Sequence, residues 1–504
     1  MSQLVVASTF YQCLSLAAAV DVGALPDPDG ERILLLADSS QAPELSVPLD
    51  RQTGFAEVAK RFDRVIDLAP LVAPRRPVQF APRADELEMW SQLLVRFWEL
   101  DAAPGSVIMD SVQVNPAPAL ARIFRHAELW THSDGLMTYS PTRKPLPTEL
   151  GQRIRGLCYV DLVPGLRPQL LAEHRPEHRT VPAAAVREVL RGVVGTAPDH
   201  DHDHDADHDR DHDRGAGHRP HALVLGQYLP SLGLISTEEE TELHRAMIAE
   251  VAGRGIDRCV FKKHPSAPPA AGWALREIAA ELGVTLVVDD GPGVAELAMI
   301  DDPPALVVSC FSTGLATARF LLGLDAVAVG TPLVLGRLTP YANSNRIPLV
   351  IADALFAGRG GGAVAPGAEL DGLVAAVAYC MQPTVVPQLR PVAVAQLARL
   401  AAEDRRTLTR YFTRRRLTRL DLPGQPPQPS AHRRALSRLK RRTLRLPVVG
   451  TVVGTALTGP DGARRSNGRV PVPARPRTGG TVHRVAHQAT AAVLGRISRA
   501  ARRR

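Results

Sequence analysis

Residues 305–322 read ALVVSCFSTGLATARFLL, and this stretch predicts the fold of the chain around it. Residues 305–308 have the apolar character and the length of a buried parallel strand. Residues 309–314 are mostly small or hydroxyl-bearing, as in a turn, and residues 315–322 have helical periodicity. A strand that leads through a short turn into a helix is one βα unit, and repeated βα units predict a doubly wound parallel sheet.

Apolar runs of the same length recur on both sides of this stretch. In the first third of the chain the predicted strands occupy residues 4–7, 33–37, 65–68, 107–109 and 128–131. In the second half they occupy residues 222–225, 258–261, 285–288, 306–309 and 326–329. The sequence therefore predicts an α/β fold with two Rossmann-like domains and a cleft between them, where ligands would meet the carboxyl ends of the strands.

Helical periodicity separates many of these strands, most clearly at residues 86–100 and 237–251. In the first of these helices the apolar side chains predicted to share one face are Leu87, Trp90, Leu93, Leu94 and Phe97. Another helix is expected at residues 392–411, within a closing segment of residues 386–421. The two domains are expected to span residues 1–165 and 221–385.

Residues 166–220 are expected to form a linker, because residues 199–214 read DHDHDHDADHDRDHDR and cannot build an apolar core. Two interpretations of this Asp/His insert stay open. A dedicated metal site needs a few ligands in fixed geometry with supporting groups around them. The simpler interpretation is a repeat expansion that binds zinc or nickel only incidentally.

The charge of the chain is divided unevenly. Residues 405–504 contain 25 Lys and Arg against two acidic residues, although the net charge of the whole chain is only +8. The preceding residues are therefore acidic overall, and an anionic partner is expected at the tail, residues 422–504, which we expect to be largely disordered. Within it, residues 433–446 resemble a basic amphipathic helix that suits an anionic bilayer. RNA binding and a tail without a partner are the alternatives, and the scarcity of aromatic residues disfavours RNA.

The cysteines and the N-terminal sequence indicate a cytoplasmic protein. The five cysteines are far apart and form no CxxC pair, which is typical of a reducing compartment. No stretch reaches the about 20 apolar residues of a membrane span, and the first residues lack the basic start of a signal peptide. Any membrane contact is expected to be peripheral, on the inner face of the cytoplasmic membrane.

Three short segments at predicted strand ends carry the candidate chemistry. The first is Ser133-Asp134-Gly135. A single Asp that faces a cleft from a strand end can act as a general base, although Asp-Gly is also a common turn. This segment alone therefore does not indicate a site, and other motifs are needed beside it.

The second segment is Lys262-Lys263-His264-Pro265, directly after a predicted strand. Its lysines make the strand end electropositive, and a histidine there can donate a proton or a hydrogen bond to a leaving phosphate. The alternative is an ordinary surface turn.

The third segment is the turn of residues 309–315, SCFSTGL, where Ser312 or Thr313 can cap the following helix. The same geometry would present hydroxyl and backbone N–H groups to an anion. The segment matches neither a Walker loop nor a GxGxxG fingerprint.

In this order the three segments resemble the motifs of bacterial sialyltransferases, most closely the capsule-type alpha-2,8-polysialyltransferase family. The family motifs are an acidic pair followed by Gly, a His-Pro pair and a Ser/Thr-rich segment. Residues 5–12, VVASTFYQ, and 225–229, LGQYL, also resemble the first strands of the two family domains. The resemblance covers residues 1–390.

The resemblance implies a GT-B fold, with the acceptor on the N-terminal domain and the nucleotide on the second. It implies inverting transfer of sialic acid, or a related nonulosonic acid, from a CMP-sugar to a surface or capsule glycan. Asp134 would deprotonate the acceptor and His264 would support departure of CMP. The implied nucleotide or phosphate ligands are Lys262, Pro265, Ser309, Ser312, Thr313 and Gly314. Further cleft candidates are Gly135, Thr9, Tyr11, Gln12 and Gln227.

The resemblance also implies that neither a metal nor a cofactor beyond the CMP-sugar donor is required, and no nucleic acid partner is expected. The chain departs from the family in three respects: Ser133 occupies the first acidic position, and the Asp/His insert and the basic tail are additional. Two alternative functions remain. One is another sugar-nucleotide-dependent GT-B transferase for cell-wall or capsule polymers, and the other is an inactive relic that binds glycan.

Overall fold

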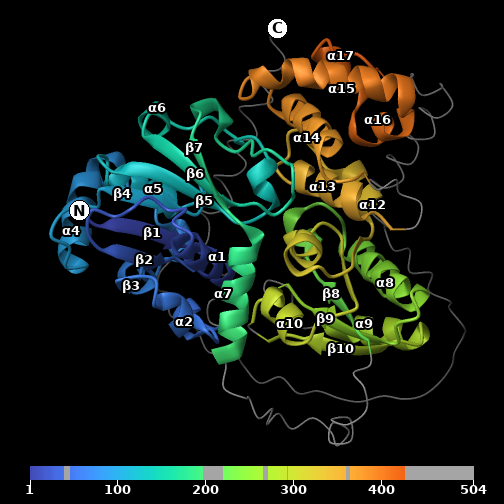
Figure 1. Cartoon of the computed structure of the whole chain (residues 1–504), viewed down its shortest axis with the longest axis horizontal. Helices are drawn as coiled ribbons and strands as arrows, with labels where there is room; N and C mark the ends of the chain where they lie inside the picture. Colours follow the sequence, from blue (N-terminus) through green and yellow to red (C-terminus); the bar gives the residue numbers. More distant parts are fainter. Residues whose placement is uncertain (39–45, 197–219, 265–270, 292, 359–363, 426–504) are drawn as a thin grey trace, which may run out of the picture. The chain divides into compact units, whose positions relative to one another are not determined.

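The computed structural model describes residues 1–38, 46–196, 220–264, 271–291, 293–358 and 364–425. Residues 1–428 form one compact unit, which contains two separate parallel sheets (Figure 1). The Asp/His insert and nearly all of the basic tail lie outside the described residues, so the interpretations of those segments are unaffected by the structure.

The first sheet has seven parallel strands in the order β3-β2-β1-β4-β5-β6-β7. The strands are β1 (Gln3–Ala7), β2 (Arg32–Leu36), β3 (Arg64–Asp67), β4 (Ser106–Met109), β5 (Glu128–Ser133), β6 (Ile154–Val160) and β7 (Glu177–Val181). The strand order reverses between β1 and β4, where Leu4 is in register with both Ile33 and Val107. Such a reversal opens a crevice at the carboxyl ends of the strands.

Helices cover both faces of this sheet, which is why its central strands are continuously apolar. The helices are α1 (Phe10–Asp21), α2 (Phe55–Ala59), α3 (Ala69–Val72), α4 (Leu87–Phe97), α5 (Ala117–Ile123), α6 (Thr148–Gly151) and α7 (Ala183–Thr196). Val5 and Ile108 share one core with α1 and α7, whereas Leu4 and Val107 share another with α4 and α5. The alternation of side chains along each strand thus builds two cores.

The first sheet continues past the expected domain boundary at residue 165. β7 pairs with β6, with Gly156 opposite Glu177, and α7 follows it to Thr196. β7 forms an edge of the sheet and has the polar sequence EHRTV, so it lacks the apolar run that marks a central strand. The first sheet and its last helix therefore extend 31 residues past the expected boundary at residue 165.

The second sheet has five parallel strands in the order β10-β9-β8-β11-β12. They are β8 (Ala222–Leu225), β9 (Arg258–Lys262), β10 (Thr285–Asp289), β11 (Leu306–Ser309) and β12 (Ala326–Ala328). The helices around them are α8 (Thr237–Gly253), α9 (Ala271–Glu281), α10 (Ala295–Asp301), α11 (Thr313–Ala316), α12 (Thr331–Arg337), α13 (Arg346–Phe356) and α14 (Ala368–Met381). A π-helical turn (Thr317–Leu322) continues α11. The order reverses between β8 and β11, so this sheet has its own crevice.

The C-terminal part of the compact unit consists of three short helices: α15 (Arg390–Glu403), α16 (Arg405–Tyr411) and α17 (Arg414–Arg419). The single helix expected at residues 392–411 is broken at Asp404, whose carboxylate accepts the N–H of Thr407 at 3.0 Å and caps α16. Asp is a strong N-cap residue, and it starts the new helix here. Asp353 in α13 is fully buried and binds Arg410 and Tyr411, which fixes α16 on α13.

The predicted fold class, an α/β fold of GT-B type with two doubly wound domains, is confirmed. The two domains contact each other directly: Arg167 donates to the carboxylate of Asp371 at 2.6 Å, and Gln382 donates to the carbonyl of Arg143 at 2.8 Å. Among the described residues, no helix combines the length and the apolar character needed to cross a bilayer.

Candidate active site

The segments that follow β5 of the first sheet and β11 of the second approach each other at Gly135 and Thr313. Gly135 follows β5 in the first sheet, and Thr313 begins α11 after β11 in the second. A Cβ atom on residue 135 would lie 3.1 Å from Thr313 Oγ1, which is tighter than ordinary packing. The structure therefore brings the first and third predicted segments into contact, and Gly at position 135 permits that approach.

Three carboxyl groups lie near this contact, and each holds its proton unusually strongly. Burial raises the pKa of Asp134 to about 6. Burial raises the pKa of Asp110, which follows β4, to about 6 although Ser8 hydrogen-bonds to it. Burial and the nearby charge of Asp134 raise the pKa of Glu296 to about 7, against the opposing charge of Lys262. Carboxyl groups with pKa values near neutrality are suited to accepting and donating protons.

Two of these three carboxyl groups, Asp110 and Glu296, were not predicted from the sequence. Asp110 directly follows a predicted strand, and its strand lies next to β1 across the reversal in strand order. The rule that ligands bind at such reversals was a usable signal for Asp110 once the strand order was known. Glu296 lies in the first turn of α10, and no local pattern marks it. Only the packing of the two domains brings it close to Asp134.

Three predicted cleft residues, Thr9, Tyr11 and Gln12, lie in or directly after the turn that follows β1. Thr9 caps α1 by accepting the N–H of Gln12 at 3.2 Å, and the side chain of Gln12 accepts the N–H of Ser8 at 2.7 Å. These two side chains therefore shape the turn. The buried hydroxyl of Tyr11 has no well-formed hydrogen bond within the described residues, although Thr317 lies close to it.

Burial raises the pKa of Tyr11, and the carboxylates of Glu296 and Asp134 raise it further. The phenol is therefore neutral at physiological pH. It therefore keeps a proton that it can donate in a hydrogen bond.

The two lysines of the second segment are paired with acidic residues from the neighbouring strand. Lys262 Nζ lies 3.0 Å from Asp289 Oδ2 and donates to the carbonyl of Gly291 at 2.7 Å. Lys263 Nζ lies 2.8 Å from Asp290 Oδ2. Because β9 and β10 are adjacent, the aspartates at the end of β10 neutralise the charge of the lysines at the end of β9. This strand end is therefore less electropositive than the sequence suggested.

His264 follows β9 and remains exposed to solvent. Partial burial of its ring lowers its pKa, so the imidazole is neutral at pH 7 and can donate one hydrogen bond. Pro265 lies outside the described residues.

The third segment is fixed by hydrogen bonds within the second sheet. Ser309 is fully buried and donates to the carbonyl of Leu225 at 2.9 Å, while the side chain of Gln227 accepts the N–H of Phe311 at 2.8 Å. These bonds join the ends of β8 and β11 across the reversal in strand order. Ser309 and Gln227 therefore use their polar groups to hold the turn.

Ser312 caps α11 by accepting the N–H of Gly314 at 3.2 Å. Thr313 Oγ1 is the hydroxyl of this segment that approaches the first domain. Gly314 packs closely against Leu225, where a Cβ atom would lie 2.5 Å from Leu225 Cδ1. Of the hydroxyl groups in the segment, Thr313 is thus the one best placed to serve a ligand between the sheets.

Ser133 holds the first segment in place. Its hydroxyl lies 2.8 Å from that of Thr138, and both side chains are buried. Ser133 is consequently turned into the protein, and Asp134 supplies the only carboxyl group of the first segment. Within the described ranges, no group of three or more His, Cys, Asp or Glu side chains is arranged to bind a metal ion.

Comparison with known proteins identifies the family. The family model described as alpha-2,8-polysialyltransferase (POLYST) matches residues 3–331. A search of curated proteins finds no relative.

Solved structures with partial similarity include a putative UDP-N-acetylglucosamine 2-epimerase from Listeria monocytogenes, at 12% identity and a TM-score of 0.40, covering 72% of this chain and 84% of that one. They also include a glycosyltransferase from Rickettsia africae, at 10% identity and a TM-score of 0.33, with coverages of 83% and 96%. MurG from Acinetobacter baumannii has 10% identity and a TM-score of 0.30, with coverages of 87% and 99%. The family assignment rests on the family match alone.

Proposed function

The chain belongs to the alpha-2,8-polysialyltransferase family, and from that premise we propose that it transfers sialic acid, or a related nonulosonic acid, from a CMP-sugar to a glycan acceptor. The chain is a glycosyltransferase of the sialyltransferase type. The observation that supports the proposal is the close approach of Gly135 to Thr313, because Gly135 directly follows the candidate base and Thr313 belongs to the candidate phosphate-binding segment.

In the proposed reaction, Asp134 is the general base. The acceptor hydroxyl oxygen forms a bond to the anomeric carbon of the donor while the bond from that carbon to the phosphate oxygen breaks. The proton of the hydroxyl passes to Asp134, and CMP leaves with the bonding electron pair. With a pKa of about 6, Asp134 is mostly ionised at pH 7, yet basic enough to take the proton as the hydroxyl attacks.

Glu296 and Tyr11 support this step by holding protons. Glu296 has a pKa of about 7 because it is buried beside Asp134. In its protonated form it can donate a hydrogen bond to a polar group of the donor or acceptor. The neutral phenol of Tyr11 offers a second donor at the same place.

The departing CMP carries negative charge, so it requires donors at the second sheet. We propose that His264 donates a hydrogen bond to its phosphate as a neutral imidazole, since its pKa is lowered. Thr313 and Ser312 would add hydroxyl groups, and Lys262 would add a charge balanced by Asp289. A monophosphate leaving group assisted in this way requires no metal.

A calorimetric titration of the full chain with CMP, UMP, GMP and UDP tests the nucleotide half of the proposal. We expect selective binding of CMP that weakens in His264→Ala. A preference for UMP, UDP or GMP would assign the chain to a different donor class, and no binding of any nucleotide would favour an inactive relic.

We also propose that the basic tail, residues 422–504, holds the enzyme on an anionic bilayer at the inner face of the cytoplasmic membrane, where lipid-anchored acceptors reside. The excess of Lys and Arg in the last hundred residues supports this proposal. Full-length protein should sediment with anionic vesicles at low salt, and protein truncated after residue 421 should not. Equal sedimentation of the two forms would contradict it.

A further inference from the structure

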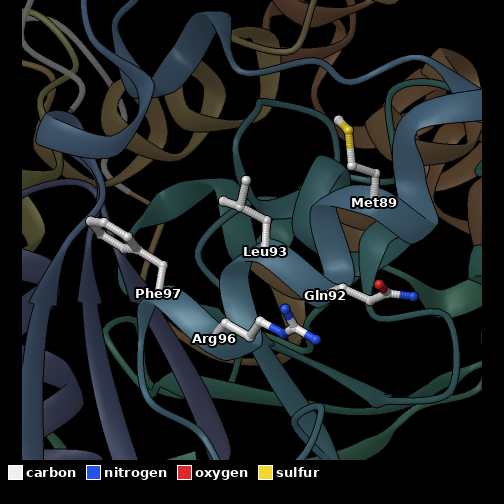
Figure 2. A pocket seen from close by; sticks show the side chains of 5 residues that line it. All are labelled: Met89, Gln92, Leu93, Arg96 and Phe97. Carbon is white, nitrogen blue, oxygen red and sulfur yellow. The ribbon is translucent and has the colours of Figure 1, made fainter.

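Helix α4 presents an apolar row on its outer side. Its inner side packs through Leu94 and Trp98, which are buried, and through Trp90, whose ring meets that of Phe80 edge to face at 5.0 Å. The outer row, which we call the α4 stripe, consists of Met89, Leu93 and Phe97 (Figure 2). The three side chains are 55%, 39% and 62% exposed. The sequence predicted that Leu93 and Phe97 share one face with Trp90 and Leu94, but only the latter two pack inward.

The α4 stripe differs from the other exposed apolar side chains of the described residues. Those other side chains occur singly on separate elements, whereas the stripe places three on one helix at intervals of four residues. Together with Gln92 and Arg96 the stripe borders a shallow depression of about 470 Å³. Contiguous exposed apolar side chains of this kind usually mark a contact surface.

The row next to the stripe carries opposite charges at its two ends. It consists of Glu88, Gln92 and Arg96, again spaced by four residues, so it runs parallel to the stripe. When two copies of α4 lie antiparallel with Leu93 at the two-fold axis, Met89 of each copy meets Phe97 of the other. In the same arrangement Glu88 of each copy meets Arg96 of the other, and Gln92 meets its own equivalent. The two rows of α4 are therefore complementary to themselves.

From this complementarity we propose that α4 is a self-association surface, on which the α4 stripe of one chain packs antiparallel against that of a second copy. Glu88 already contacts Arg125 at 3.8 Å, but both side chains are exposed and such a pair is weak, so Glu88 can exchange partners. The stripe is short, whereas stable dimers bury about 1,600 Å² in total. The association is consequently weak and depends on protein concentration.

An anionic bilayer fits this surface less well than a second copy does. Asp85, just before α4, and Glu88, in its first turn, are 74% and 66% exposed and would bring negative charge close to the negative headgroups. A second copy instead offers Arg96 to Glu88. The charges next to the α4 stripe therefore favour a second copy over an anionic bilayer as its partner.

Charge reversal tests the pairing. In Glu88→Arg, two arginines would face each other at each contact of a homodimer, and in Arg96→Glu two glutamates would do so. Sedimentation velocity of the full chain over a concentration series should show the wild type associating. Each single variant should associate roughly tenfold more weakly or not at all, because like charges are juxtaposed.

Two further experiments combine the same substitutions so that opposite charges at positions 88 and 96 face each other again, and they decide between the outcomes. An equimolar mixture of Glu88→Arg and Arg96→Glu should form a mixed dimer, and the double variant Glu88→Arg/Arg96→Glu should associate like the wild type. Association in the mixture would also show that both single variants fold. Failure of both experiments to restore association would overturn the proposal.

Two further variants check the apolar contact. Leu93→Glu places two carboxylates at the axis and should abolish association, whereas Val22→Glu, at an exposed apolar residue elsewhere, should not change it. A wild type that stays monomeric at every concentration would overturn the proposal. So would a wild type that binds anionic vesicles through Leu93 and Phe97 while remaining monomeric, because the bilayer would then be the partner.

Discussion

The carboxyl ends of the two sheets differ in how their polar side chains are satisfied. At the second sheet Lys262 pairs with Asp289, and Ser309 and Gln227 bind the backbone of the turns. At the first sheet one carboxylate oxygen of Asp110 and the hydroxyl of Tyr11 are buried and lack well-formed hydrogen bonds within the described residues.

The pKa values show the same contrast. Burial raises the pKa of Asp110 and Asp134 at the first sheet, whereas the ion pair with Lys263 lowers the pKa of Asp290 at the second. A carboxyl group with a raised pKa is costly to the fold but useful for proton transfer. From this comparison we propose that the end of the first sheet, together with Glu296 of α10, supplies the proton chemistry, and that the turns of the second sheet form a rigid frame for the donor.

Among the variants that test this contrast, Asp134→Asn should lower the rate of transfer most strongly. The variant retains the size of the side chain but cannot accept a proton, so we expect the rate of transfer to fall roughly 10³-fold while CMP affinity stays unchanged. Steady-state kinetics and calorimetry on the same protein measure both quantities. Asp67, whose pKa is also raised by burial, ends β3 away from the reversal in strand order, and Asp67→Asn is the control. Equal losses in the two variants would remove the assigned role of Asp134.

His264→Ala should have the next largest effect. The loss of one hydrogen bond to the leaving phosphate should lower turnover roughly 10²-fold. CMP binding should also weaken, which distinguishes this residue from Asp134. His178→Ala on β7 is the matched control, because partial burial lowers the pKa of that imidazole too. An unchanged turnover in His264→Ala would contradict its placement at the leaving group.

Gly135→Ala should affect both halves of the site more mildly, with a loss of roughly tenfold in rate. The new methyl group would press on Thr313 Oγ1 across the two domains. Gly195→Ala, where a Cβ atom meets open space, should leave the rate unchanged.

A double-mutant cycle sharpens the prediction for Gly135. If the methyl group acts through Thr313, then Gly135→Ala in a Thr313→Ala background should cost little more than Thr313→Ala alone. Fully additive losses would show that the two segments do not act on each other.

Glu296→Gln should raise the melting temperature slightly, and only at a pH high enough to ionise Glu296 in the wild type. The pKa of Glu296 in the folded protein is about 7, above the about 4.3 of an unfolded chain. The folded state therefore binds this proton more tightly, and the resulting stability is complete below pH about 4 and lost as the pH rises toward 7. Gln cannot ionise, so the variant should melt about 2–4 °C higher than the wild type at pH 8, with no difference at pH 4. Calorimetric melting at both pH values measures this, and a lower melting temperature at pH 8 would contradict the burial of a charge.

The sequence predicted the strands well because most of them are buried on both faces and therefore continuously apolar. β8 and β11 have the predicted bounds, whereas β6 and the polar edge strand β7 were both missed. Periodicity alone also failed at α4, since it could not tell which side of the apolar arc would face the core. Asp404, a polar residue in an otherwise helical pattern, marks where the expected helix divides.

The candidate site was predictable only where strand ends carry it. Asp134 and Thr313 follow strands of different sheets, and the structure brings their segments together. Glu296 and the pairs formed by Lys262 and Lys263 were not anticipated, because their partners come from other elements of the chain. The assignment of catalytic roles remains a prediction.

The most direct test of the central proposal is the transfer reaction itself. Purified full-length protein should be incubated with CMP-N-acetylneuraminic acid and a soluble oligosialic acceptor, and CMP release and product mass should be followed together. The account predicts a product one sialic acid longer for each CMP released, with activity that declines as the pH falls below about 6, when Asp134 becomes protonated. Transfer from a UDP- or GDP-sugar instead, or no transfer from any donor, would contradict it.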